Sequence, residues 1–483
     1  MNRRMVIYRI GQIMLLEAAL LFIPMVVSVI YGEVRCFRAF AFSVLTALAI
    51  GAVFKFFFKP SDKVIFAREG FSIVAFAWIL LSLVGALPFY ISGEIPNFAD
   101  AFFETVSGFT TTGASILTDV EAMSQSLLFW RSFTHWIGGM GVLVLIMAII
   151  PSDSGRSMHI IRAEMPGPVV GKLVPKLSNT AKILYVIYFV LTFIETVLLI
   201  FGGMPVFDSI VYALGTAGTG GYGIKADSVG SYSPYLQWVI AVFMVIFGVN
   251  FNLFYLILLK KFGAAFKNTE LWFYFGIIAV STMIIMFSIY PMYSGTEEAF
   301  RHSFFQVSSI ISTTGYSTAD FNQWPSLAKG IIFVLLFVGG CAGSTAGGLK
   351  ISRVLILFKL LQNDIKQMLH PRAVTSVKID GKTVDSNTLK RVTTYFALYI
   401  LLNTVVFLLI SYEPFDLETN LTAAISCVNN VGPGLGDIGP AGSYAGYSDI
   451  STVILSFAML LGRLEIFPII LAFDYKNWIN KNK

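Results

Sequence analysis

The segment SGFTTTGASI, from Ser107 to Ile116, places three consecutive threonines and a glycine between two apolar stretches. Threonine and glycine are weak formers of a membrane-spanning helix, because a β-branched side chain and a bare backbone both oppose helix formation. A related segment, SSIISTTGYS, returns at Ser308 to Ser317. The recurrence indicates that the chain repeats one polar, glycine-containing element within an otherwise apolar protein.

The composition of the chain is that of a membrane protein. Of its 483 residues, 56% are hydrophobic and 13% are charged, and the mean hydropathy is +0.75. Such a chain has too few polar side chains to cover a soluble globule of this size. The N-terminal run MNRRMVIYRIGQIMLLEAALLFIPMVVSVI is long enough to span and lacks a small-residue cleavage site, which predicts a retained first helix. Cys36, Cys341 and Cys427 share no ligand or redox spacing, so we expect them to be structural.

Apolar segments of about 20 residues predict about ten spanning helices in an all-α polytopic protein. We expect them near residues 5–30, 37–58, 69–92, 125–151, 180–203, 233–260, 269–293, 323–360, 390–411 and 449–474. Lysine and arginine crowd every second connection, at 59–68, 156–182, 260–267 and 353–391, and both termini. These parts are therefore predicted to be cytoplasmic. The net charge of +6 reflects this topology, and we do not expect nucleic-acid binding.

The other connections repeat one pattern. They read NFADAFFETVSGFTTTG, PVFDSIVYALGTAGTGGYG, GTEEAFRHSFFQVSSIISTTGYS and PFDLETNLTAAISCVNNVGPG. Each opens on an acidic residue, continues with apolar residues at helical spacing and ends in a Thr/Asn/Gly cluster. The four copies align on Gly113, Gly221, Gly315 and Gly432, about 100 residues apart, which is longer than solenoid periods.

This repeat predicts four membrane-pore-membrane units around one pseudo-fourfold ion pore, with four re-entrant pore helices. We assign an extra N-terminal helix pair to residues 1–60, and repeats 1 to 4 to residues 61–155, 156–265, 266–365 and 366–483.

A segment of about 12 residues is too short to span, and non-helical backbone at membrane depth is tolerated only where it lines a cavity. Backbone carbonyls can replace the hydration shell of a monovalent cation, and glycine permits the required conformations. The acidic residues suit the positive ends of the short helices, and no lysine or arginine lies in the clusters to favour an anion. A tight extracellular turn is the alternative for any one cluster, although four copies in register disfavour it.

We therefore predict a selectivity filter in which backbone carbonyls, for the most part, coordinate a monovalent cation. Its residues are Thr110, Thr111, Thr112 and Gly113; Thr219, Gly220, Gly221 and Tyr222; Thr313, Thr314, Gly315 and Tyr316; and Asn430, Val431 and Gly432. In repeat 2 the alignment on Gly221 rather than Gly220 is the less secure one.

The second helix of each repeat carries a small-residue motif midway: GGMG, GVNFN, GGCAGSTAGGLK and GRLE. The third motif cannot be a stable helix against lipid, so we predict a break that projects into the pore as a gate. The predicted gate comprises Gly339, Gly340, Cys341, Ala342, Gly343, Ser344, Thr345, Ala346, Gly347, Gly348 and Lys350, together with Arg463. A small-residue packing face is the alternative, and it is the favoured one for Gly138 to Gly141.

Arg463 lies well inside the last apolar segment, where a charge usually faces a cavity or a partner. We expect it in the pore below the filter, in contact with the gate. Snorkelling toward the cytoplasm and a local pair with Glu465 are the alternatives. The second is weak because residues two apart do not face each other on a helix.

Other functions find little support in the sequence. The histidines lack metal or catalytic spacing, and no nucleotide-binding or nucleophile-elbow motif is present, so we expect no enzyme, no organic cofactor and no transition-metal site. Ser344 as a nucleophile of a membrane-embedded enzyme is a remote alternative. A carrier with inverted repeats would need halves of opposite topology, whereas all four units enter from one side.

The motifs SGFTTTGAS, STTGYST, NNVGPGLG, HWIGGMG, RAEMPGP, GGCAGSTAGGLK and LLGRLEIF resemble those of the Trk/Ktr/HKT superfamily of potassium transporters over nearly the whole chain. The extra helix pair makes it most similar to the TrkH type of bacterial potassium-uptake subunit. GTAGTGGYG in repeat 2 departs most from the family pattern.

The resemblance implies potassium uptake across the cytoplasmic (inner) membrane, with one filter glycine per repeat linked to selectivity. It also implies an intramembrane gating loop, a homodimer in membrane lipid and a cytosolic nucleotide-binding regulator of the TrkA type. The long basic connections 153–182 and 353–391 are expected to dock this regulator. A less selective Na⁺/K⁺ pathway and a proton-coupled symporter remain the alternative functions.

Overall fold

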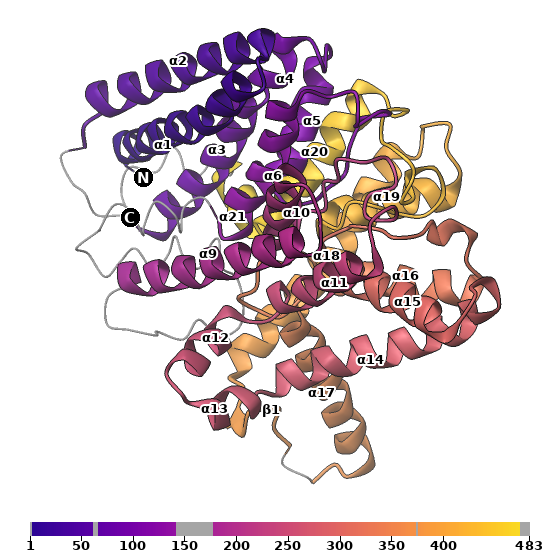
Figure 1. Ribbon diagram of the computed structural model, residues 1–483. Helices are drawn as coiled ribbons and strands as arrows, with labels where there is room; N and C mark the ends of the chain where they lie inside the picture. Colours follow the sequence, from indigo (N-terminus) through magenta and orange to yellow (C-terminus); the bar gives the residue numbers. More distant parts are fainter. Residues whose placement is uncertain (1, 61–65, 142–176, 373–374, 474–483) are drawn as a thin grey trace.

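The computed structural model describes residues 2–60, 66–141, 177–372 and 375–473 (Figure 1). Their regular structure is helical apart from one hairpin, which pairs β1 (Lys378–Ile379) with β2 (Lys382–Thr383). Within these residues six helices are long and apolar enough to cross a membrane, and two bent helix pairs bring the number to eight. The prediction of an all-α polytopic membrane protein is confirmed.

The N-terminal pair consists of α1 (Arg3–Ile30) and α2 (Val34–Phe57), which run side by side in Figure 1. Glycines allow the two helices to approach closely: a Cβ on Gly11 would lie 2.7 Å from the Cβ of Phe54. On its other side α1 packs against the first helix of repeat 1. The pair is therefore an addition at the edge of the repeats.

Each repeat contains a long first helix and a short pore helix, and in repeats 2 to 4 the second helix is interrupted. Repeat 1 comprises α3 (Ala67–Gly85), α4 (Leu87–Ser92), α5 (Phe98–Phe109) and α6 (Gln125–Gly139). Repeat 2 comprises α9 (Leu177–Phe201), α10 (Val206–Gly218), α11 (Pro234–Phe247), α12 (Phe251–Leu258) and α13 (Phe262–Phe266). Repeat 3 comprises α14 (Thr269–Ile289), α15 (Thr296–Ile311), α16 (Ser326–Leu336) and α17 (Ile351–Leu369), with 3₁₀ turns η2 (Tyr290–Met292) and η3 (Phe321–Gln323). Repeat 4 comprises α18 (Ser386–Ile410), α19 (Leu417–Asn429), η4 (Gly436–Ile438), α20 (Asp449–Arg463) and α21 (Phe467–Phe473).

The pore helices α5, α10, α15 and α19 begin with acidic residues, as the sequence pattern indicates. Asp100 and Asp208 lie in the first turns of α5 and α10, where a negative charge complements the helix dipole. In α19 the N-cap Asp416 accepts a hydrogen bond of 2.8 Å from the backbone N–H of Thr419. The hydroxyl and the backbone N–H of Thr419 lower the pKa of Asp416 below its usual value, so this carboxylate stays ionised at the helix N-terminus.

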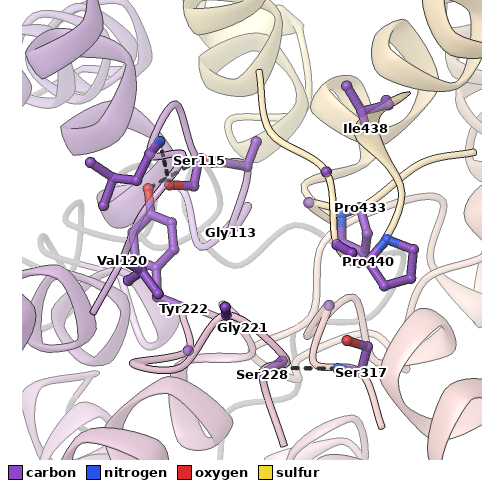
Figure 2. Close-up of a pocket in the computed structure, with 18 of the residues that line it drawn as sticks. Gly113, Ser115, Val120, Gly221, Tyr222, Ser228, Ser317, Pro433, Ile438 and Pro440 are labelled. Atoms are coloured by element: carbon purple, nitrogen blue, oxygen red, sulfur yellow. Dashed lines mark hydrogen bonds between the residues drawn. The ribbon is translucent and has the colours of Figure 1, made fainter. Parts of the chain in front are cut away.

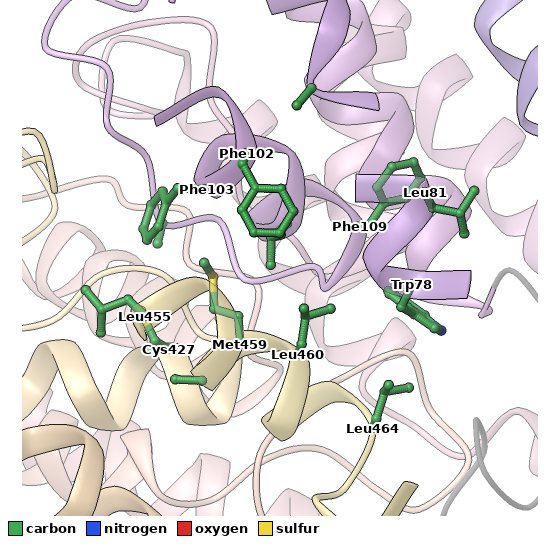
Figure 3. Close-up of a cluster of buried hydrophobic side chains, with 14 of the residues drawn as sticks. Trp78, Leu81, Phe102, Phe103, Phe109, Cys427, Leu455, Met459, Leu460 and Leu464 are labelled. Carbon is green, nitrogen blue, oxygen red and sulfur yellow. The ribbon is translucent and has the colours of Figure 1, made fainter. Parts of the chain in front are cut away.

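A buried apolar cluster joins the first repeat to the last (Figure 3). Phe103 and Phe109 of α5 are almost fully buried in it, as are Leu455 and Met459 of α20. In Figure 3, Phe102 of the same pore helix lies between Phe103 and Phe109. Repeats that lie at opposite ends of the sequence therefore pack side by side, which is what a closed ring of four units requires.

The helices lie where the apolar segments predict them, although the predicted spans 233–260 and 449–474 are each found as a bent helix pair. The predicted span 125–151 is described only to residue 141, and the expected docking connection 153–182 lies largely outside the described residues. The predicted span 323–360 is found as α16 and α17, separated by residues 337–350. Residues 365 and 366, where we divide repeats 3 and 4, lie inside α17, so a division after Leu369 would follow the helices more closely.

Candidate ion pathway

All four pore helices end in the same Schellman motif, which satisfies the last carbonyls of each helix. The backbone N–H groups of Thr112, Gly220, Thr314 and Val431 donate to the carbonyls of Ser107, Gly215, Ser309 and Ser426, with N···O distances of 2.9, 2.9, 2.8 and 3.0 Å. The left-handed residues of these motifs are Thr111, Thr219, Thr313 and Asn430, with φ of 57°, 56°, 55° and 55°. A β-branched residue in this conformation costs about 1–3 kcal/mol, so the three threonines mark strained backbone at a common position.

Two residues after each strained residue comes a left-handed glycine. The four glycines are Gly113, Gly221, Gly315 and Gly432, with φ of 79°, 80°, 88° and 98°. Repeat 2 follows the same spacing, since Thr219 corresponds to the strained position and Gly221 to the glycine. The backbone therefore supports the alignment on Gly221 that the sequence alone leaves insecure.

The four loops contact one another in a closed cycle. A Cβ on each filter glycine would lie within 2.5 Å of a backbone carbonyl oxygen in the next repeat. The facing pairs are Gly113 with Gly220, Gly221 with Thr314, Gly315 with Val431, and Gly432 with Thr112. Any side chain at these four positions would therefore collide with backbone. The cycle runs through the repeats in order and returns from the fourth to the first, so the loops form one ring.

This ring suits a dehydrated monovalent cation. An alternation of left-handed and ordinary residues lets successive carbonyls face the same side, whereas in a regular strand they alternate. On the outer side, all four filter glycines line one cavity of about 160 Å³, part of which is drawn in Figure 2. The arrangement can offer carbonyl oxygens from four directions to an ion that arrives through this cavity.

Two of the strained threonines contact the groups below the filter: Thr313 binds the broken helix of repeat 3, and Thr111 binds Arg463 of α20. The hydroxyl oxygen of Thr313 accepts a bond of 2.7 Å from the backbone N–H of Gly347, and that of Thr111 accepts a bond of 3.2 Å from Arg463. These contacts explain why threonine, and not glycine, is useful at the left-handed position. Its hydroxyl ties the filter to the segment below.

That segment, residues 337–350 between α16 and α17, is a compact loop closed at its neck. Val338 and Leu349 form an isolated parallel bridge, and the N–H of Gly339 donates to the Leu349 carbonyl at 3.0 Å. Its tip is held by repeat 2, since the N–H of Phe251 donates to the carbonyl of Gly343 at 3.0 Å. The cavity that this loop lines with Arg463 measures only about 30 Å³, room for about two water molecules. The loop therefore fills the space below the filter.

Arg463, at the end of α20, connects three parts of the pathway. Its guanidinium donates to the carbonyl of Thr345 in the loop at 2.9 Å, and to the carbonyls of Gly138 and Gly139 at 2.5 and 2.9 Å. Because the guanidinium also binds Thr111, it contacts the filter, the C-terminal end of α6 and the loop at the same time. Glu465, the alternative local partner, instead forms an ion pair with Arg353 of α17.

The second helices of repeats 2 and 4 are interrupted at related points, and that of repeat 1 is described only to its end at Gly139 and the two residues that follow. α11 and α12 meet at 92° and α20 and α21 at 114°, while α6 ends at Gly139. Gly138 and Gly462 lie against the ends of α5 and α19, where a Cβ would overlap the carbonyls of Phe109 and Val428. Such close contact between helices is expected if Gly138 to Gly141 form a small-residue packing face, the alternative given in the sequence analysis.

A buried ion pair behind the filter was missed in the sequence analysis. Glu104 of α5 and Arg131 of α6 are 2.7 Å apart, with side chains 0% and 3% exposed. The Glu104 carboxylate also accepts the backbone N–H of Ile116 at 3.1 Å, and the Arg131 guanidinium lies 4.0 Å from the ring centre of Tyr222. The pair thus holds the outer ends of the filter loops of repeats 1 and 2. Two opposite charges inside apolar segments, in FFETVSGF and FWRSF, were the available signal.

Replacing Glu104 with glutamine should destabilise the protein by about 3–5 kcal/mol, because Arg131 would keep a buried charge without a counter-charge. Thermal unfolding of the purified protein in detergent measures this loss. Glu297→Gln is the matched control, since Glu297 pairs with Arg301 while its side chain is 63% exposed. Its loss should cost about 0–1 kcal/mol. Equal effects of the two substitutions would contradict the role assigned to the buried pair.

The fold and the four capped loops define an all-helical membrane protein with a single-chain ring of pore loops. Residues 37–479 match the TrkH family, described as cation transport protein. The chain belongs to this family.

Individual relatives cover nearly the full chain. It is 35% identical to the Trk system potassium uptake protein TrkH of Salmonella typhimurium, over 99% of this chain and 100% of the relative. It is 36% identical to the Trk system potassium uptake protein TrkG of Escherichia coli, over 98% of both. The crystal structure of the potassium transporter TrkH from Vibrio parahaemolyticus has a TM-score of 0.88 and 30% identity, covering 99% of this chain and 100% of that one. These relatives are transporters and not enzymes, in agreement with the sequence analysis.

Proposed function

We propose that this protein takes up potassium across the cytoplasmic membrane through the ring of filter loops. The observation that carries the proposal is the closed cycle in which each filter glycine lies against a carbonyl of the next repeat. The printed functions of the relatives, potassium uptake and potassium transport, support the choice of ion. Potassium is then the transported ion, coordinated by backbone oxygens.

We further propose that the loop 337–350 is the gate. It fills the space below the filter, and the hydrogen bonds that hold it can be exchanged: it makes one with Thr313, one with Arg463, one with Glu270 and several with the break between α11 and α12. Control would come from a cytosolic nucleotide-binding regulator of the TrkA type acting on a homodimer in the membrane, since the relatives belong to a named multi-part system. We also propose that both termini lie on the cytoplasmic side.

Ion flux into liposomes containing the purified protein tests the function. Potassium and rubidium should enter much faster than sodium or lithium under the same membrane potential. Comparable sodium entry would favour the less selective alternative, and potassium accumulation driven by an imposed pH gradient at zero potential would favour proton-coupled symport. Absence of cation flux in correctly folded protein would contradict the proposal.

Arg463→Ala should raise basal potassium flux by about tenfold, because a loss of about 1.4 kcal/mol of holding energy shifts the loop equilibrium by that factor. Selectivity should not change, since the carbonyl ring is intact. Arg463→Lys should resemble the alanine variant, as one ammonium group cannot reach acceptors on three segments. Stopped-flow flux measures all three proteins. Unchanged flux in Arg463→Ala would show that the guanidinium does not restrain the loop.

A further inference from the structure

One buried carboxyl group binds both the loop and the helix that follows it. Glu270, in the first turn of α14, is 6% exposed, and its Oε1 accepts two backbone N–H groups. One is that of Ala342 inside the loop, at 2.7 Å, and the other is that of Ser352 in the first turn of α17, at 3.0 Å. One oxygen that accepts two backbone donors ties the two segments to the same side chain. Any movement of the start of α14 therefore changes the hold on the loop.

The start of α14 is in turn capped from outside by the β1–β2 hairpin. Asp380, at the hairpin turn, accepts the backbone N–H and the hydroxyl of Thr269 through one oxygen, both at 2.8 Å. Its second oxygen accepts the side-chain amide of Asn268 at 3.3 Å. Asp380 and Gly381 have φ of 49° and 76°, as a two-residue hairpin turn with both central residues left-handed requires. The turn geometry therefore presents Asp380 directly to the helix N-terminus.

The hairpin does not pack tightly against the rest of the protein at this place. A cavity of about 470 Å³ is lined by hairpin residues, including Ile379 and Lys382, and on its inner side by Glu270, Ala342 and Ser352. Its hold on α14 consequently depends on the few bonds of Asp380 and not on a continuous apolar contact. Besides these bonds, the hairpin segment is held by the buried side chain of Val377 and by Lys359 of α17, whose ammonium donates to the Lys378 carbonyl.

We propose that the hairpin is the contact through which a cytosolic partner moves the loop, by way of Asp380, the N-terminus of α14 and Glu270. This rests on the proposed function in that the loop is taken as the gate. The exposed residues Lys378 and Lys382 flank the turn, so the fitting partner surface is acidic. When the partner pulls the hairpin away, Thr269 loses its acceptor, the first turn of α14 loosens, and Glu270 releases Ala342 and Ser352.

Hydrogen exchange of the full-length protein in nanodiscs tests the link without requiring the partner. Asp380→Ala should accelerate exchange of the Ala342 and Ser352 amides by about tenfold, because the anchor of these amides becomes free to move. Asp380→Asn should stay close to the wild type, since it keeps an oxygen acceptor for Thr269. Asp385→Asn is the matched control. Asp385 lines the same cavity and is the N-cap residue of α18, but its side chain makes no capping hydrogen bond.

The route is tested by combining substitutions. If Glu270 transmits the effect, Asp380→Ala should add nothing to the exchange rate of the Ser352 amide in Glu270→Ala protein, which has no side-chain acceptor at this position. An equal acceleration in both backgrounds would overturn the route through Glu270. Faster exchange confined to residues 377–384 in Asp380→Ala would overturn the link altogether.

Potassium flux separates this inference from the proposed function. Asp380→Ala should raise basal flux of the protein without its partner, and Asp385→Asn should not. If Asp380→Ala accelerates exchange of the Ala342 and Ser352 amides while neither the wild type nor any variant conducts cations, the result supports the link and contradicts the proposed function. If potassium flux is selective and unchanged in Asp380→Ala, and exchange of the Ala342 and Ser352 amides is also unchanged, the link is overturned and the proposed function stays intact.

Discussion

Gly113→Ser should lower the potassium-to-sodium permeability ratio by about tenfold or more, since about 1.4 kcal/mol of lost discrimination suffices for that factor. The residue has a φ of 79°, and its Cβ would overlap the carbonyl oxygen of Gly220 in the neighbouring repeat. The ring must therefore shift at the point where carbonyls face the ion, in addition to the cost of a left-handed serine. Competitive rubidium and sodium flux in liposomes measures the ratio.

Gly93→Ser is the matched control for this substitution. Gly93 ends α4 with a φ of 80°, nearly that of Gly113, but nothing lies within 4 Å of the position of its Cβ. Both variants carry the same backbone strain, and only one disturbs the ring. Selectivity should therefore survive in Gly93→Ser. A ratio that is unchanged in Gly113→Ser and Gly315→Ser would falsify the assignment of these glycines to the filter.

Deleting Gly343 to Ala346 should raise basal potassium flux by roughly tenfold or more without altering ion preference. The deletion removes the tip that fills the space under the filter, including the Thr345 carbonyl that Arg463 holds. The neck of the loop at Val338 and Leu349 remains. Flux measured before any regulator is added gives the basal rate.

Thr345→Val serves as the control for the deletion. It removes the hydroxyl that donates to the Phe247 carbonyl at 3.2 Å and keeps the backbone carbonyl that Arg463 binds. We expect a change of less than about threefold, since one neutral hydrogen bond contributes about 0.5–1.5 kcal/mol and part of it is recovered by packing. A folded deletion variant that conducts less than the wild type would show that the loop is structural packing and not a gate.

The sequence was informative wherever lipid or the repeat restricts the choice of residues. Long apolar segments predicted the helices, and four aligned clusters predicted the pore helices because a short apolar helix has no other stable place in a bilayer. The glycine-rich run between 339 and 348 predicted the break in the third repeat for the same reason. In repeat 2, the doubt over Gly220 and Gly221 could be resolved only by the backbone angles.

Contacts between distant parts of the chain could not be predicted in this way. Glu104 and Arg131 are 27 residues apart, and Arg353 and Glu465 are 112 apart, with no periodicity that joins them. Their charges were visible in apolar segments, but their partners depend on how the repeats close into a ring. The position of the strained threonines in the repeat was enough to predict them as filter residues. The contacts of their hydroxyl groups with Arg463 and Gly347 could not be predicted, because they depend on the folded loop.

The four filter loops follow one another on a single polypeptide, and this fixes the order and copy number of the quadrants during synthesis. A pore assembled from four identical subunits receives every substitution in all four quadrants at once. Here one codon changes one quadrant, so variants with one, two, three or four altered quadrants can each be made as homogeneous protein. The unequal quadrants of the present chain, with Val431 where another repeat has Thr112, are already an example of such independent change.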